Sequence, residues 1–190
     1  ADRVIAELQE LGLEVEEDDA GARIDSNAGN LLCRLPGRVE GGTPIFFCAH
    51  LDTVPPQGAI EPVVEEGVVR NAGGTILGAD NKAAVAAMIE AARRIVAGRL
   101  PHAGVELLFT QKEEVGLLGA GAFDHTQLEA ELGFVYDQAA PIGEVILGAP
   151  YQRSMVVRFH GRAAHAGMVP EEGRSAIAAA ARAVADLRLG

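Results

Sequence analysis

The sequence predicts an α/β fold, in which a sheet is covered by helices. Mostly apolar runs of strand length occur at 44–49, 105–110 and 132–136, and all three are expected to be buried strands. The run at 44–49 lacks polar alternation, which is typical of a strand buried on both faces. Between the first two runs, 81–97 is rich in Ala and contains no Gly or Pro, which predicts a helix. Strands and helices that alternate in this way form a sheet with helices packed on it.

The rest of the chain adds shorter elements. Apolar residues at helical spacing predict a helix over 4–11 that ends at Gly12, and strands are expected at 13–16 and 30–35. The stretch between these two strands is polar and rich in Gly. Two Val pairs on either side of 65–67 predict a small hairpin. A short helix is expected between the last two strands of the sheet.

A domain boundary is expected near Pro150, which divides the chain into 1–149 and 150–190. Beyond the boundary, 155–159 is predicted to be a strand and 175–187 an Ala-rich helix. About forty residues are too few for a complete hydrophobic core. The second part is therefore expected to be the beginning of a further domain, and the chain a fragment of a longer protein.

Composition and charge argue against several classes of function. The 190 residues include 16 Lys and Arg against 27 Asp and Glu, a formal net charge of −11, whereas proteins that bind duplex nucleic acid need cations to neutralise phosphates. No apolar run approaches the roughly 18 residues of a membrane span, and the first residues lack the order of a signal peptide. Cys33 and Cys48 lie in apolar runs, which predicts buried free thiols and a cytoplasmic location.

Two polar residues, His50 and Asp52, follow the apolar run at 44–49. They stand two positions apart, so on an extended chain their side chains point the same way. Ligands bind at this end of the strands in open α/β sheets. Asp52 would either share a metal ion with His50 or hold the far ring nitrogen of its imidazole, which fixes the tautomer. The alternative is a surface histidine beside a turn aspartate.

A Gly-rich loop carries Asp80 into the Ala-rich helix. The loop, 72–78, contains three glycines, which indicates that its backbone passes close to another group. The alternative role for Asp80 is that of a helix N-cap.

Two adjacent carboxylates, Glu113 and Glu114, follow the run at 105–110. Adjacent carboxylates repel each other, and a bound cation relieves the repulsion. One glutamate would then bind the metal ion while its neighbour takes a proton from a bound water. Alternatively, the pair would lie at a helix N-terminus, where the helix dipole tolerates negative charge.

Asp137 ends the run at 132–136 with another carboxylate. Four separate strand ends are thus expected to bring Asp, Glu or His side chains toward one edge of the sheet. Carboxylates together with imidazole suit zinc, manganese or cobalt rather than a thiolate site. A further histidine, His165, lies in the segment 161–167; on its own, a loop histidine of this kind would be structural or solvated.

Together the motifs resemble those of the co-catalytic zinc peptidase family that includes peptidase T, carboxypeptidase G and the aminoacylases. Five motifs occur in the family's order: HLDTVPP, LGADNKAAVAAM, TQKEEVGLLGA, VYD and GRAAHAG. The resemblance covers almost the whole chain and is closest to peptidase T-like proteins. It implies a phosphorylase/hydrolase-like mixed sheet with helices on both faces, followed by the start of an α+β lid (dimerisation) domain.

The resemblance also implies a site for two metal ions in the intact enzyme, Zn²⁺ or else Mn²⁺ or Co²⁺. His50 and Asp137 resemble ligands of the first ion, Glu114 a ligand of the second, and Asp80 the carboxylate that bridges both. The peptide bond between Asp80 and Asn81 resembles one that is often cis. The family's last ligand, a histidine in a later segment, has no counterpart here, so one ion or none is expected to bind to this chain.

Three more residues take catalytic roles by the same resemblance. Asp52 resembles the carboxylate behind His50, and Glu113 resembles the general base that activates the water. His165 resembles the lid histidine that polarises the substrate carbonyl, in dimeric members from the opposite subunit.

The implied activity is metal-dependent hydrolysis of a peptide bond by a peptidase T-like aminopeptidase or tripeptidase, with the fragment itself expected to be inactive. The alternatives are an N-acyl amino acid amidohydrolase and an inactive metal-binding fragment. The implied partners are a short peptide substrate and a second subunit in a homodimer formed through the lid domain, with neither nucleic acid nor membrane.

Overall fold

The structure is a computed structural model that describes residues 1–139, 141–151 and 154–187. It divides into two compact units, 1–140 and 141–190. Each unit is described by itself below.

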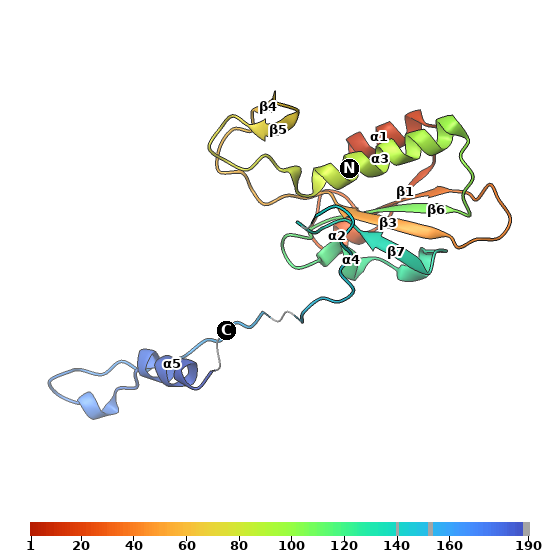
Figure 1. Ribbon diagram of the computed structural model, residues 1–190. Helices are drawn as coiled ribbons and strands as arrows, with labels where there is room; N and C mark the ends of the chain where they lie inside the picture. Colours follow the sequence, from red (N-terminus) through yellow and green to blue (C-terminus); the bar gives the residue numbers. More distant parts are fainter. Residues whose placement is uncertain (140, 152–153, 188–190) are drawn as a thin grey trace. The chain divides into compact units, whose positions relative to one another are not determined.

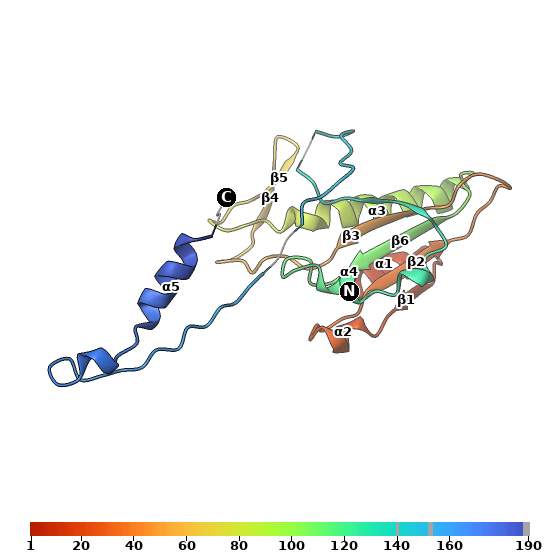
Figure 2. The ribbon, with the colours of Figure 1, turned by 90° about the horizontal axis from the view of Figure 1, so that it is seen from below.

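The first unit is built on a mixed five-stranded sheet. Its strands, in spatial order, are β1 (Val15–Glu17), β2 (Leu31–Leu35), β6 (Val105–Thr110), β3 (Ile45–His50) and β7 (Leu132–Val135). β3 is parallel to both of its neighbours, β6 and β7, whereas β2 is antiparallel to β6 and to β1. Because β6, β3 and β7 run in one direction, their carboxyl ends lie at the same edge of the sheet, as Figure 2 shows for β6 and β3.

Helices cover both faces of this sheet, which confirms the predicted α/β class (Figure 1). α1 (Asp2–Glu10) and α3 (Ala79–Gly98) lie on one face, while α2 (Ala20–Arg23) and α4 (Leu118–Ala122) lie on the other. A 3-10 turn, His125–Gln127, follows α4. The predicted hairpin is also present, as β4 (Pro62–Glu65) and β5 (Val68–Asn71).

Apolar side chains are buried on both sides of the sheet. The larger cluster joins Val4 and Leu8 of α1, and Val85 and Met88 of α3, to the strands. The strand residues in that cluster are Leu31, Cys33, Leu35, Ala49, Val105, Leu107 and Phe109. The smaller cluster, on the opposite face, consists of Leu32, Cys48, Leu108 and Phe123. Two buried faces explain why β3 is apolar without alternation.

Phe109 is the largest fully buried side chain of β6 and lies in the larger cluster. We expect Phe109→Ala to lower the free energy of unfolding by about 3–5 kcal/mol, because the lost ring leaves a cavity that close-packed neighbours fill only in part. Urea unfolding followed by circular dichroism measures the change. Val64→Ala, in the hairpin where Val64 is 73% exposed, is the control and should stay within about 0.5 kcal/mol. Equal effects of the two substitutions would contradict this core.

Both cysteines are buried and free, as the sequence predicts. Burial raises the pKa of the Cys33 thiol to about 11 and, against a hydrogen bond with Thr110, that of Cys48 to about 11. The thiolate is the reactive form, so both side chains act as small apolar residues of the core.

One strand is placed differently from the sequence expectation. Burial is predicted for 132–136, but in β7 the side chains of Leu132 and Val135 are 51% and 65% exposed. β7 is the last strand in the order, and among the described residues its only strand partner is β3. An edge strand has a neighbouring strand on one side only, so an apolar pattern does not guarantee that its side chains are buried.

The second unit contains less regular structure than predicted. The expected strand at 155–159 is wrong, because these residues carry no ladder and a strand requires a partner for its backbone groups. Pairing among the residues described there is limited to one bridge between Arg162 and Arg174. The expected helix is present as α5 (Ala176–Ala185), where the Ser175 hydroxyl accepts from the Ala178 N–H at 3.1 Å. A short 3-10 helix, Pro170–Glu172, precedes it.

Among the helices in the described part of the chain, none combines the length and the apolar character that crossing a membrane requires.

Candidate metal centre

His50 ends β3 and is almost completely buried, at 2% exposure. Its Nδ1 lies 2.9 Å from the backbone oxygen of Asp52 and 3.4 Å from the Asp52 carboxylate. Its Nε2 lies 3.1 Å from the Asp80 carboxylate and 3.8 Å from that of Asp137. A neutral imidazole that donates from Nδ1 to the Asp52 carbonyl leaves the Nε2 lone pair free, which is the form that binds metal ions.

The electrostatics at His50 are dominated by two opposing effects. Burial lowers the pKa of the imidazole, but the hydrogen bond with Asp80 and the charges of Asp137 and Asp52 outweigh it and raise the pKa. The carboxylates of Asp80, Asp137 and Asp52 therefore favour a positive charge beside them.

Asp80 reaches His50 because the chain turns sharply before α3. Gly78 has a φ of +77°, and the peptide bond between Asp80 and Asn81 is cis, as the resemblance implied. Asp80 and Asn81 have non-helical dihedral angles, so the regular part of α3 begins after them. The Asp80 carboxylate is turned to the His50 ring, 3.1 Å from its Nε2.

Glu113 and Glu114 lie in a turn between β6 and α4. Their backbone N–H groups donate to the two carboxylate oxygens of Asp52, at 3.0 and 3.2 Å. The helix that follows starts only at Leu118, so the pair does not occupy its first turn. Asp52 therefore links the end of β3 to the backbone that carries the glutamate pair.

Asp137 lies two residues beyond β7 and is held by its neighbours. The Tyr136 N–H donates to the Cys48 carbonyl at 3.0 Å, and the Tyr136 ring stacks on Phe47 with 5.6 Å between centroids. The Asn81 side chain donates to the Tyr136 carbonyl. Burial raises the pKa of Asp137, and the charge of Asp80 adds to this rise, while His50 opposes it.

Asn81 and Lys82, the two residues that follow Asp80, help to build this centre through side-chain hydrogen bonds that the sequence did not predict. Asn81 ties the start of α3 to the segment after β7, and the Lys82 ammonium donates to the Leu51 carbonyl between His50 and Asp52. Their position directly after Asp80 was the available signal.

Two groups of side chains that share His50 are arranged to hold a metal ion. In one, His50 is joined by Asp80 and Asp137, and in the other by Glu113 and Glu114; within each group the ligand atoms lie within 4.8 Å of one another. Burial and the charge of Asp137 raise the pKa of Glu113, because the carboxylates crowd one another. Imidazole and carboxylate donors fit zinc, and a divalent cation would relieve this repulsion.

His165, the remaining residue of the predicted site, belongs to the second unit. Its Nδ1 accepts a hydrogen bond from the Gly167 N–H at 3.2 Å. The neutral ring then carries its proton on Nε2, which is free to act as a donor.

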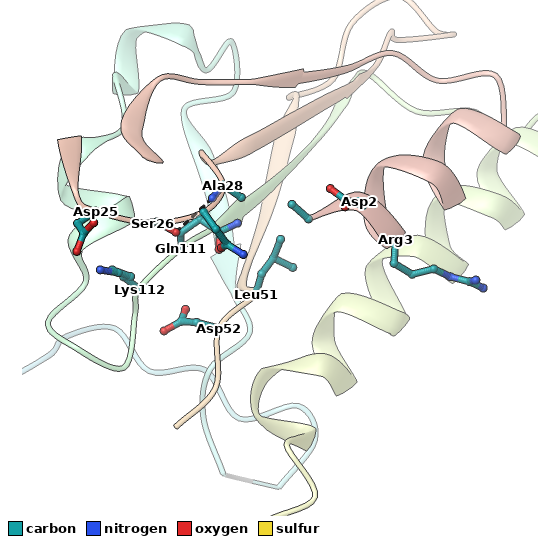
Figure 3. A pocket seen from close by; sticks show the side chains of 11 residues that line it. Asp2, Arg3, Asp25, Ser26, Ala28, Leu51, Asp52, Gln111 and Lys112 are labelled. Carbon is teal, nitrogen blue, oxygen red and sulfur yellow. Dashed lines mark hydrogen bonds between the residues drawn. The ribbon is translucent and has the colours of Figure 1, made fainter. Parts of the chain in front are cut away.

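A pocket of about 610 Å³ is lined on one side by Leu51 and Asp52 (Figure 3). The start of α1, the segment 25–28, Gln111 and Lys112 line the rest of it. Gln111 Nε2 is buried without a hydrogen-bond partner among the described residues. His50, Asp80 and Asp137 are not in the lining, so this pocket is distinct from the metal-binding groups.

Comparison with known families agrees with this geometry. The sequence profile described as Peptidase family M28 matches residues 30–150, which include His50 and every carboxylate of the two groups. The chain belongs to peptidase family M28. In this M28 chain, residues 151–190 match a second profile, described as Peptidase dimerisation domain.

Several proteins resemble the M28 chain over nearly its full length. It is 41% identical over 183 residues to the uncharacterized protein YqjE of Bacillus subtilis (strain 168), an alignment that covers 96% of the chain and 49% of that protein. The crystal structure of aminopeptidase PepT from Bacillus cereus ATCC 10987 matches with 37% identity and a TM-score of 0.81, over 100% of the chain and 51% of that structure.

The crystal structure of a tripeptidase from Staphylococcus aureus subsp. aureus Mu50 matches with 34% identity and a TM-score of 0.84, over 100% of the chain and 50% of that structure. The M28 chain thus spans about half the length of the relatives that it matches. The predicted peptidase T-like family and the mixed α/β fold are both confirmed.

Proposed function

We propose that the chain carries the metal centre of a metal-dependent peptidase, of the peptidase T-like aminopeptidase or tripeptidase type, that hydrolyses short peptides. The observation that carries the proposal is the convergence of His50 with four carboxylates in two groups at one edge of the sheet. The solved structures of an aminopeptidase and a tripeptidase, both above 30% identity, support this substrate class.

The proposed ligands of the first ion are His50 and Asp137, with Asp80 shared between two ions and Glu114 on the second. Zn²⁺, or Mn²⁺ or Co²⁺ in its place, fits this donor set. When bound, such ions polarise the scissile carbonyl group and make a bound water more acidic.

Glu113 is the proposed general base. Its carboxylate accepts a proton from the attacking water and delivers that proton to the leaving amine, so that it ends the cycle in its starting form. The raised pKa of Glu113 increases its proton affinity. Asp52 supports the reaction in two ways, because its backbone oxygen orients the His50 ring and its carboxylate holds the Glu113 backbone.

His165 is the proposed hydrogen-bond donor to the substrate carbonyl. With Nδ1 occupied by the Gly167 N–H, its Nε2–H is available for the oxygen on which negative charge develops. We further propose a cytoplasmic protein, which suits its free thiols, and a homodimer formed through residues 150–190, which suits the dimerisation profile matched there.

Peptide hydrolysis by the whole protein tests the proposal. We expect cleavage of unmodified tripeptides, loss of that activity on dialysis against a chelator, and recovery on addition of Zn²⁺. Released amino acids are quantified by chromatography, with N-acyl amino acids as the comparison substrates. Faster cleavage of the N-acyl amino acids would identify an amidohydrolase instead, and full activity in the chelated protein would contradict the metal-dependent mechanism.

A further inference from the structure

The two glutamates of the metal-binding groups are carried by a closed loop, Gln111–Gly119, which we call the glutamate loop. Three backbone hydrogen bonds close it: the Gly119 N–H donates to Gln111 at 2.8 Å, the Leu118 N–H to Lys112 at 3.0 Å and the Leu117 N–H to Glu113 at 2.9 Å. Gln111 and Gly119 therefore form the neck of the loop, and the glutamates lie beyond it.

One buried side chain spans this neck. The amide of Asn30, a residue 1% exposed, accepts from the Gln111 N–H at 3.2 Å and donates to the Gly119 carbonyl at 3.0 Å. Packing at the neck is tight, because a Cβ added at Gly119 would lie 2.2 Å from the Gln111 oxygen and 2.6 Å from Asn30 Oδ1. Asn30 thus bonds to both sides of the neck at once.

Asp18 fixes the orientation of the Asn30 amide. Asn30 Nδ2 donates to one Asp18 carboxylate oxygen at 2.8 Å, and the Asn30 N–H donates to the other at 2.7 Å. The Ala20 N–H, at the start of α2, donates to that second oxygen at 3.0 Å. Both hydrogens of the Asn30 amide and its oxygen then have partners, so a flipped amide would place donors against donors and acceptors against acceptors.

We propose that Asn30 is a positioning residue for Glu113 and Glu114, an inference that rests on the metal centre of the proposed function. Asp52 holds the backbone of the two glutamates, and Asn30 holds the neck from which their loop extends. With one anchor at each end, the loop keeps both carboxylates beside His50. Asn30 acts through the loop and, in the described structure, makes no hydrogen bond to the metal-binding side chains.

Hydrogen exchange measured by mass spectrometry on the metal-free chain tests the anchoring itself. We expect Asn30→Ala to speed exchange of the amides in 111–119 by about tenfold, as befits the loss of buried hydrogen bonds, while 105–109 of β6 stays protected. If the Asn30→Ala variant does not fold, Asn30→Asp is used in its place. This substitution keeps the shape of the side chain and the acceptor oxygen but loses both N–H donors of the amide. Leu8→Ala, a core substitution in α1, is the control for general destabilisation.

The pattern of hydrogen exchange shows whether Asn30 anchors the glutamate loop. A rise confined to 111–119 in the Asn30 variant, and absent from the Leu8→Ala variant, supports the proposal. An equal rise over the whole sheet in both variants would overturn it, because Asn30 would then be only one more contributor to overall stability.

Zn²⁺ affinity measured by competition with a chelating dye tests the link to the metal centre. We expect Asn30→Ala to weaken Zn²⁺ binding by about 10–100-fold, the range seen when groups behind metal ligands are removed. In a Glu113→Gln/Glu114→Gln background the same substitution should have no further effect, whereas in an Asp137→Asn background it should still weaken binding. Equal effects in both backgrounds would overturn the proposal.

The two measurements separate the inference from the function on which it rests. A whole protein that binds no Zn²⁺, while the exchange of 111–119 responds to the Asn30 substitution, would refute the metal centre and support the anchoring of the loop by Asn30. A chain that binds Zn²⁺ with unchanged affinity in the Asn30 variants would keep the metal centre and refute the role of Asn30.

Discussion

We expect Glu113→Gln to reduce peptide hydrolysis by the whole protein by about 10²–10⁴-fold, the contribution typical of a general acid–base group. The amide cannot accept the proton of the attacking water, yet its size and its backbone bond to Asp52 are unchanged. Zinc content should therefore remain near that of the unmodified protein. Turnover of a tripeptide and metal content by mass spectrometry are the two measurements.

Glu114→Gln provides the matched control, because it changes the neighbouring side chain of the same loop in the same way. It should lower the zinc content, since Glu114 is the proposed ligand of the second ion. If Glu113→Gln lost zinc while Glu114→Gln retained it, the roles of the two glutamates would be exchanged. If Glu113→Gln and the unmodified protein hydrolysed the tripeptide at comparable rates, Glu113 would not be the general base.

The second large effect is expected at His50, the one residue common to both metal-binding groups. His50→Ala should weaken Zn²⁺ binding by more than about 100-fold, beyond the 10–100-fold range for groups that only support a ligand. Dye competition measures the affinity, and circular dichroism shows whether the variant is folded, since the ring is buried.

His125→Ala is the control for the His50 substitution. His125 begins the 3-10 turn after α4 and is exposed, and it belongs to neither group of ligands. Its removal should leave Zn²⁺ affinity within about twofold, as for other surface substitutions. An equal loss in the two variants would mean that the zinc measured is bound elsewhere.

The sequence predicts that distant residues meet at this centre because the positions of strand ends follow from the sheet topology. Parallel neighbours β6, β3 and β7 end at one edge, so polar residues that follow the three strands are brought together wherever the loops are short. Asp80 is brought to the same place by the turn at Gly78. The burial of β3 on two faces was likewise predictable from its unbroken apolar run.

The supporting hydrogen bonds could not be predicted in the same way. Asp52 binds backbone groups 61 and 62 positions away, and Asn30 binds Gly119 across 89 positions. Such contacts depend on how turns are oriented in space, for which a single Asp or Asn in a polar segment carries no pattern. Edge position is similarly invisible in the sequence of β7, whose apolar residues suggest a burial that the five-stranded sheet does not provide.

Crystals of the chain grown with Zn²⁺, and measured by anomalous diffraction at the zinc absorption edge, show which side chains bind the metal ion. We expect a zinc peak about 2.0–2.2 Å from His50 Nε2 and from carboxylate oxygens of Asp80 and Asp137. Zinc bound only at other side chains, with His50 and these two carboxylates left without an ion at saturating Zn²⁺, would contradict this expectation.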